Sequence, residues 1–261
     1  MSRYSGSGPL MKRLWPLLVL MTACASAPAS KERYAEPGRG EPVRGPWSEV
    51  ASFEMPTGDV TIPIDLLRDV ADALLKLPGA KTCDAGSQRP IVGLSMEYCS
   101  TVYVAGTEDA LSWRVTKPLR GSYNGCQPSS DVTDSEHSAE QIWIVGYIHN
   151  HPCGTPPSTL DLTVWPTDAF AGKPALAEFR MIPGNPAPAM FKGQALLMAS
   201  ALVAERADGS RVFLRYFPTG EIEQWSQQER RWRLLGTCVP TRTRYSSAPL
   251  CRDGAVQLLA E

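Results

Sequence analysis

The chain has 261 residues, with 26 basic and 27 acidic side chains and 43% hydrophobic residues. This balance of charge excludes the strongly basic or acidic surface that would attract nucleic acid or an acidic membrane. The length fits one domain of ordinary size, with its own core, plus a targeting segment and a linker.

The N-terminus resembles an export signal. Lys12 and Arg13 precede a short apolar stretch, 14–21, which ends at small residues before Cys24. This order is typical of a secretory signal peptide, and the stretch is too short to span a bilayer as a helix. Met-Thr-Ala-Cys also resembles a bacterial lipobox, which implies removal of residues 1–23 and lipidation of Cys24. Plain secretion, with cleavage at the Ala-Ser-Ala that follows, is the alternative.

The cysteine count supports export. Six cysteines remain after Cys24, and an even number in an exported protein predicts disulfides. Six cysteines allow fifteen pairings, so spacing does not give the connectivity. Cys238–Cys251 is the pair we most expect, because it would clip a C-terminal tail of little hydrophobic content. We expect a cell-envelope protein, lipid-anchored to a bacterial membrane (the outer membrane is favoured), with its domain in the periplasm or at the cell surface.

Composition divides the mature chain into three parts. Residues 24–48 are rich in Ala, Ser, Pro, Glu, Gly and Arg, which predicts a disordered tether. Residues 49–236 would form the folded domain, and residues 237–261 the clipped tail. The domain begins with a predicted helix, in which Thr61 can be the N-cap and Pro63 lies in the first turn. Apolar residues recur there at helical spacing, at Ile64, Leu67, Val70, Ala71 and Leu74.

Strands are predicted beyond this helix. The run 90–105 is apolar and β-branched but contains Glu97, and a carboxylate in such a run needs a partner or a purpose unless it faces water at a sheet edge. A polar stretch, 121–141, predicts a long loop in which His137 is an exposed histidine rather than a ligand. Further strands are predicted at 112–116, 142–148, 196–204, 211–217 and 221–225.

The segment 147–161 reads Y-I-H-N-H-P-C-G-T-P-P-S-T-L-D and carries the chemistry. His149 and His151 end an apolar strand and are two residues apart, so their imidazoles point to one face. Pro152 ends the strand. Asp161 can return a carboxylate to the same place, and two imidazoles, one carboxylate and a water make the open tetrahedral set of a catalytic zinc.

Two neighbours leave alternatives open. Ser158 and Asp161 also fit a capping box, in which the aspartate would serve a helix N-terminus rather than a metal. Cys153 is either a soft fourth ligand or, as an oxidising compartment favours, part of a disulfide.

H-x-H-P followed by S-x-x-D resembles the JAMM motif of the JAB/MPN-domain zinc metalloproteases. The resemblance spans about 62–232 and implies an α/β, three-layer sandwich related to cytidine deaminases, with a mixed central β-sheet flanked by helices. It implies that His149, His151 and Asp161 bind Zn²⁺ and that Ser158 stabilises the tetrahedral intermediate. Six residues separate His151 from Ser158, where the commonest family spacing has seven.

The family also uses a glutamate at the head of its first strand, often with a cysteine two positions later, to activate the zinc-bound water. Glu97 with Cys99 matches this pattern, and Glu108 and Glu140 are the alternatives. The resemblance implies a zinc-dependent peptidase or isopeptidase with a protein or peptide substrate. The alternatives are a catalytically inactive MPN-like scaffold and a binding lipoprotein of the envelope. A zinc deaminase is disfavoured, because H-x-E and P-C-x-x-C do not occur.

Overall fold

The structure is a computed structural model, and it describes residues 33–36, 42–55, 60–129, 131–163, 190–239, 249–252 and 254–260. The predicted signal peptide, 1–23, and Cys24 lie outside this part of the chain. Within it, no helix combines the length and the apolar character needed to cross a membrane.

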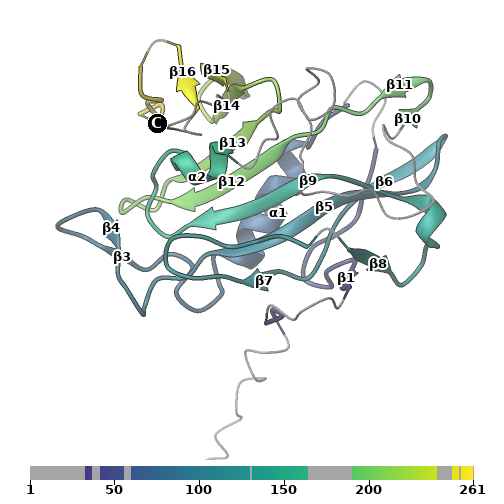
Figure 1. The fold of residues 1–261 in the computed structure, drawn as a ribbon, viewed down its shortest axis with the longest axis horizontal. Helices are drawn as coiled ribbons and strands as arrows, with labels where there is room; N and C mark the ends of the chain where they lie inside the picture. Colours follow the sequence, from purple (N-terminus) through teal and green to yellow (C-terminus); the bar gives the residue numbers. More distant parts are fainter. Residues whose placement is uncertain are drawn as a thin grey trace, which may run out of the picture.

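Strands are the main regular secondary structure of the described chain (Figure 1). The helical elements are α1 (Ile64–Leu74), the 3-10 helix η2 (Ala139–Gln141) and α2 (Thr159–Thr163). The strands are β1 (Val43–Gly45), β2 (Phe53–Glu54), β3 (Cys83–Asp84), β4 (Arg89–Pro90), β5 (Tyr98–Thr107), β6 (Ala110–Val115), β7 (Leu119–Arg120), β8 (Val132–Asp134), β9 (Ile142–His151), β10 (Met190–Phe191), β11 (Gln194–Ala195), β12 (Ser200–Glu205), β13 (Arg211–Tyr216), β14 (Glu221–Ser226), β15 (Arg231–Val239) and β16 (Leu250–Cys251).

One large mixed sheet dominates the fold, in the order β16-β15-β14-β13-β12-β9-β5-β6-β2, with β7 added beside β5. Among its described strands, β9 and β12 run parallel and the other neighbours run antiparallel. Short connections, 206–210 through Gly209 and 217–220, join the antiparallel neighbours β12, β13 and β14.

The predicted three-layer α/β sandwich is wrong. The described chain has one long helix, α1, behind the sheet, and no helical layer covers the other face (Figure 1). Helical spacing in the sequence indicated this helix alone, and a second helical layer was implied only by the family resemblance. Short strands, α2 and the C-terminal segment lie on that face instead.

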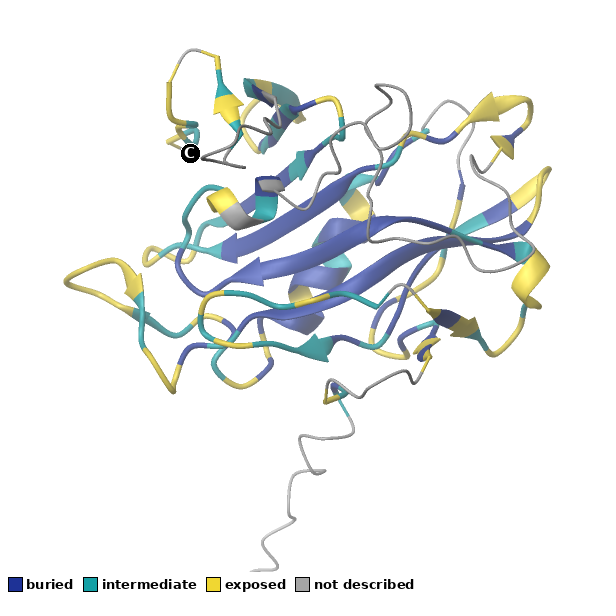
Figure 2. Ribbon diagram, viewed as in Figure 1, coloured by how far each residue is buried: buried dark blue, intermediate teal, exposed yellow. Residues whose placement is uncertain are grey.

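The main core lies between α1 and the sheet. Alternate residues of the central strands, such as Val102, Ile148 and Val203, face the helix and are fully buried. Figure 2 shows this buried centre, with most of the exposed residues at the periphery, in hairpins, loops and short strands. The predicted Thr61 cap is not formed, because the helix starts two residues later, with Pro63 at the N-cap position. The Thr61 hydroxyl has no hydrogen-bond partner in the described chain.

The opposite face of the sheet carries three smaller apolar clusters. Tyr103 and Val132 belong to the cluster under β8, and Tyr147 and Tyr216 belong to the one beside α2. The third, around Leu202, packs against the C-terminal segment. His149 and His151 project from this face of β9, next to the cluster that contains Tyr147.

Three disulfides join the six cysteines of the described chain: Cys83–Cys153, Cys99–Cys126 and the expected pair Cys238–Cys251. Such bonds form and persist in oxidising compartments, which places the domain outside the cytoplasm. Cys153 is therefore part of a disulfide rather than a metal ligand.

The disordered tether predicted for 24–48 includes residues near its C-terminal end that are folded. Val43–Gly45 forms β1, which pairs with β8, and Trp47 is buried in the main core. Apolar residues alternate within this Pro-rich and Gly-rich stretch, and the alternation indicates a strand. The composition alone does not. The loop predicted at 121–141 likewise contains β8 and η2. His137 is only partly exposed, and its Nδ1 lies 3.3 Å from Asp134.

Gly146 allows β9 to pass close to the segment before β12. A Cβ added there would collide with the backbone carbonyl oxygen of Ala199, which cannot move without breaking the sheet. We expect Gly146→Ala to lower the free energy of unfolding by about 1–3 kcal/mol, as overpacking does. Urea-induced unfolding measures this change. Gly86→Ala is the matched control, because its Cβ meets Asp84 at an ordinary 3.6 Å; equal effects of the two changes would contradict the prediction.

Candidate metal centre

Two histidines lie at the C-terminal end of β9. His149 and His151 are 1% and 6% exposed, and their ring centroids lie 5.0 Å apart. In register, His149 pairs with Cys99 of β5 on one side and with Leu202 of β12 on the other. Their positions are therefore fixed by neighbouring strands on both sides, as strand periodicity predicted.

Asp161, in α2, places its carboxylate beside the two histidines. Its Oδ1 lies 3.3 Å from Nε2 of His149, and its Oδ2 lies 3.2 Å from Nε2 of His151. The same carboxylate accepts the backbone N–H of Ser158 at 2.6 Å, while the Ser158 hydroxyl accepts the N–H of Asp161 at 3.2 Å. The capping box and the contact with the histidines are thus both present, and the cap orients the carboxylate toward the imidazoles.

Glu97 lies immediately before β5, two residues from Cys99 and so on the same face as His149. Its carboxylate and one nitrogen of each histidine lie within 4.8 Å of one another, which is within reach of one metal ion. The side chain is buried, with 5% of the residue exposed. We call Glu97, His149, His151 and Asp161 the four-residue cluster.

The two carboxylates of the four-residue cluster differ in their electrostatics. Burial raises the pKa of Glu97 to about 7; His151 opposes this shift and the Asp161 charge adds to it. Burial also favours the protonated form of Asp161, but the adjacent imidazoles, His149 first, outweigh it and hold the pKa well below its usual range. Asp161 is therefore anionic at neutral pH, and Glu97 can exchange a proton there.

The ring nitrogens support a ligand role for the histidines. Nδ1 of His151 lies 3.0 Å from the Thr155 hydroxyl and 3.3 Å from the Thr155 carbonyl, so Nε2 is left for Asp161 or a metal. Both nitrogens of His149 are buried, and within the described chain neither makes a hydrogen bond of normal geometry. Nε2 lies 3.3 Å from Asp161, so Nδ1 is the nitrogen that has no neighbouring polar partner there. A cation bound between Nε2 and the Asp161 carboxylate would satisfy Nε2, which is costly to bury unpaired.

The spacing of the donor atoms fits a small four-coordinate metal ion. Four ligands at about 2.0–2.1 Å in a tetrahedron are separated by roughly 3.3 Å. The distances of 3.3 Å from Oδ1 of Asp161 to Nε2 of His149 and of 3.2 Å from Oδ2 to Nε2 of His151 are close to this separation. The three side chains are therefore near enough to share one divalent cation.

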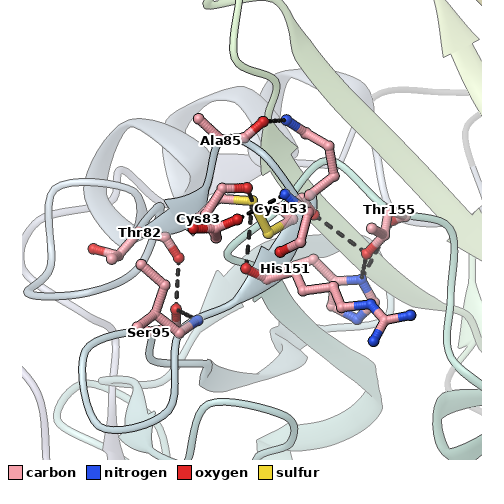
Figure 3. The surroundings of a disulfide bond; sticks show 12 residues. Thr82, Cys83, Ala85, Ser95, His151, Cys153 and Thr155 are labelled. Carbon is pink, nitrogen blue, oxygen red and sulfur yellow. Dashed lines mark hydrogen bonds between the residues drawn. A yellow bond between two sulfur atoms is a disulfide. The ribbon is translucent and has the colours of Figure 1, made fainter.

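Loops around the cluster are cross-linked. Cys153, two residues after His151, is bonded to Cys83 in the β3–β4 hairpin (Figure 3). The hydroxyl of Ser95 bonds to the carbonyl of Thr82, which holds the segment leading to Glu97 against this hairpin. The loop after His151 and the Glu97 segment are thus connected through the β3–β4 hairpin.

The alternative glutamates lie elsewhere. Glu140 is exposed in η2, before the start of β9, and Glu108 is exposed beyond the far end of β5. Each is separated from the cluster by a ten-residue strand, a distance of roughly 30 Å. Ser158 is exposed at the α2 cap, and its hydroxyl bonds to Asp161.

Sequence reasoning missed several residues around the cluster. The Tyr147 ring stacks on His149 at 5.6 Å, and its hydroxyl accepts a 2.7 Å hydrogen bond from Tyr216. Strand alternation could have indicated Tyr147, which is two residues before His149. Thr155 and Tyr216 carry no local signal, because their contacts depend on the folded loop and on sheet order.

A second group, Asp134, Glu136 and His137, also has its ligand atoms within 4.8 Å of one another. The Arg114 guanidinium already pairs with both carboxylates, at 3.2 Å from Asp134 and 2.7 Å from Glu136, and offsets one of their two charges. This group is therefore an ion-pair network that fixes the segment after β8, and the four-residue cluster is the better metal site.

No family model, curated protein or solved structure matches this chain. The function must therefore be inferred from the residues and distances of the metal centre itself.

Proposed function

We propose that the protein is a zinc-dependent peptidase or isopeptidase of the JAMM type. One observation carries the proposal: a partly buried Asp161 carboxylate lies 3.2–3.3 Å from Nε2 of both His149 and His151, with the second carboxylate, Glu97, beside them. Two imidazoles and one carboxylate with an open fourth position are the donor set of hydrolytic zinc sites.

Zinc is favoured over other cations by the donor types. Magnesium and calcium prefer oxygen ligands, whereas the cluster offers two nitrogens and one oxygen. His149, His151 and Asp161 would hold the ion. When bound, zinc supplies a Lewis acid and lowers the pKa of a coordinated water to about 7.

Glu97 is assigned the proton transfers. Its pKa of about 7 allows it to accept a proton from the attacking water and to donate it to the leaving amine. Burial at 5% exposure keeps the carboxylate in place and away from competing water. Glu97 lies on the same face as the histidines, so its carboxylate would face a water held by a metal at this site.

Ser158 is assigned to the oxyanion. Its hydroxyl oxygen accepts the Asp161 N–H, so the hydroxyl proton stays available for donation toward the substrate. A donor of this kind contributes roughly 3–4 kcal/mol to the stabilisation of a transition state. The capping box would thus orient both the metal ligand and the oxyanion donor.

We also propose that Cys24 is lipidated and anchors the domain to a bacterial membrane, with the outer membrane favoured. The six other cysteines pair with one another, so disulfide formation does not need Cys24. Its position after an apolar stretch, in Met-Thr-Ala-Cys, is typical of a lipobox. Several acyl chains on one residue would give stable anchoring.

Zinc content tests the ligand set. We expect about one zinc per chain in the purified wild-type protein, and loss of most of it in His149→Ala and Asp161→Ala, because a four-coordinate site needs these donors. Elemental analysis by mass spectrometry measures this. His137→Ala is the matched control, since it removes the third histidine and should keep its zinc. A zinc-free wild type would refute the proposal.

Glu97→Gln separates catalysis from metal binding. We expect it to keep zinc and to lose about 10²- to 10⁴-fold in kcat on a quenched fluorescent peptide library, because the amide cannot transfer the proton. Glu108→Gln and Glu140→Gln are matched controls and should retain wild-type turnover. Full activity in Glu97→Gln would exclude the assigned base; a zinc-loaded wild type that cleaves no peptide would favour the scaffold alternative.

Membrane fractionation tests the anchor. Cys24→Ala should release the protein from the membrane fraction into the soluble periplasm, because the acyl acceptor is gone. Immunoblotting of the fractions measures the distribution. Ser26→Ala, two residues away, should leave the protein on the membrane. Unchanged membrane association of Cys24→Ala would argue against lipidation.

A further inference from the structure

We propose that Asn150, the residue between the two histidines, is a positioning residue that sets the place of Glu97 relative to the metal ligands. The inference rests on the proposed function, because it concerns the same reaction. Asn150 belongs to β9, so its side chain points to the sheet face opposite to that of His149 and His151. It is fully buried there.

The Asn150 amide makes three hydrogen bonds to backbone groups far away in the sequence. Its Oδ1 accepts the N–H of Tyr98 at 2.8 Å. Its Nδ2 donates to the carbonyl of Met96 at 3.1 Å and to the carbonyl of Ala80 at 2.6 Å. Two of these three groups belong to the immediate neighbours of Glu97 in the chain.

Hydrogen bonds thereby hold the backbone on both sides of Glu97. Asn150 binds the peptide groups of Met96 and Tyr98, which flank it. The backbone N–H of Glu97 donates to Ser122 at 2.7 Å, and its carbonyl accepts the N–H of Gly121 at 2.8 Å. The segment therefore has little freedom to shift, and the Asn150 side chain adds a direct link to the histidine strand beyond the pairing of Cys99 with His149.

The position of Asn150 makes this link short. It is covalently adjacent to both His149 and His151, so a displacement of its backbone displaces the two ligands with it. The contact with Ala80 ties the same unit to the loop after α1. One residue thus joins the ligands, the proposed base and the loop into a single rigid unit.

An amide suits this role better than other side chains of its size. The site needs one acceptor and two donors in one plane, which asparagine supplies. Aspartate could accept from Tyr98 but would oppose two carbonyl oxygens, and an apolar side chain would leave three backbone groups without partners. Misplacement of a catalytic group by about 1 Å can reduce turnover roughly 10²-fold.

The test is a double-mutant cycle on zinc-loaded protein, using the peptide that the wild type cleaves best in the fluorescent library. Asn150→Ala should keep its zinc affinity within about 3-fold and its KM near the wild-type value, and lose about 10²-fold in kcat. Its Tyr98 amide should exchange with solvent faster, as measured by NMR. Asn150→Asp is a second variant that preserves the volume and should show the same pattern if Asn150→Ala does not fold.

Coupling to Glu97 distinguishes positioning from a general structural role. Asn150→Ala combined with Glu97→Gln should be no slower than Glu97→Gln alone, because the displaced group is already inactive. Gln224→Ala is the matched control: it removes another buried amide, whose Oε1 accepts the Leu259 N–H at 2.8 Å, and should leave kcat unchanged.

The outcomes separate the two proposals. Wild-type kcat in Asn150→Ala, loss of zinc together with activity, or additive losses in the double variant would overturn the positioning role alone. A wild type without zinc or turnover would overturn the proposed function, and this inference with it.

Discussion

The alternation of side chains along β9 is the constraint on which the site depends. Because neighbouring residues of a strand point to opposite faces, H-N-H sends two imidazoles to one side and an amide to the other. The imidazoles meet Asp161 at 3.2–3.3 Å, and the amide meets the backbone around Glu97. Strands on both sides of β9 fix its register, so the two faces cannot shift independently.

Burial explains why the polar groups of this site are arranged so densely. Two carboxylates and two imidazoles lie in a largely desolvated position, where unpaired charge is costly. Asp161 is stabilised by the histidines and by the N–H of Ser158, whereas Glu97 is stabilised less and keeps a raised pKa. The two carboxylates therefore differ in pKa, because their hydrogen-bond and charge partners differ. Proton-transfer chemistry requires such a difference.

Local patterns in the sequence predicted much of this site. They did not predict contacts between residues far apart in the chain. The histidine strand, the α1 stripe and the S-x-x-D cap depend on neighbours within a few residues, and all three are formed. The Asn150 contacts bridge 52 to 70 residues, and the pairing of β1 with β8 joins Val43 to Val132. The helix-flanked sandwich was wrong because it was carried over from a resemblance rather than indicated by periodicity. Short strands of two or three residues give no pattern long enough to recognise.

The two disulfides beside the four-residue cluster impose an order on the maturation of the protein. Cys99 lies next to His149 in the sheet, and Cys153 follows His151 by two residues. These bonds form only after the chain has left a reducing cytoplasm. The loops around the ligands reach their final places at that stage, so the supply of metal outside the cytoplasm, rather than the cytoplasmic pool, decides which ion the newly folded domain encounters first.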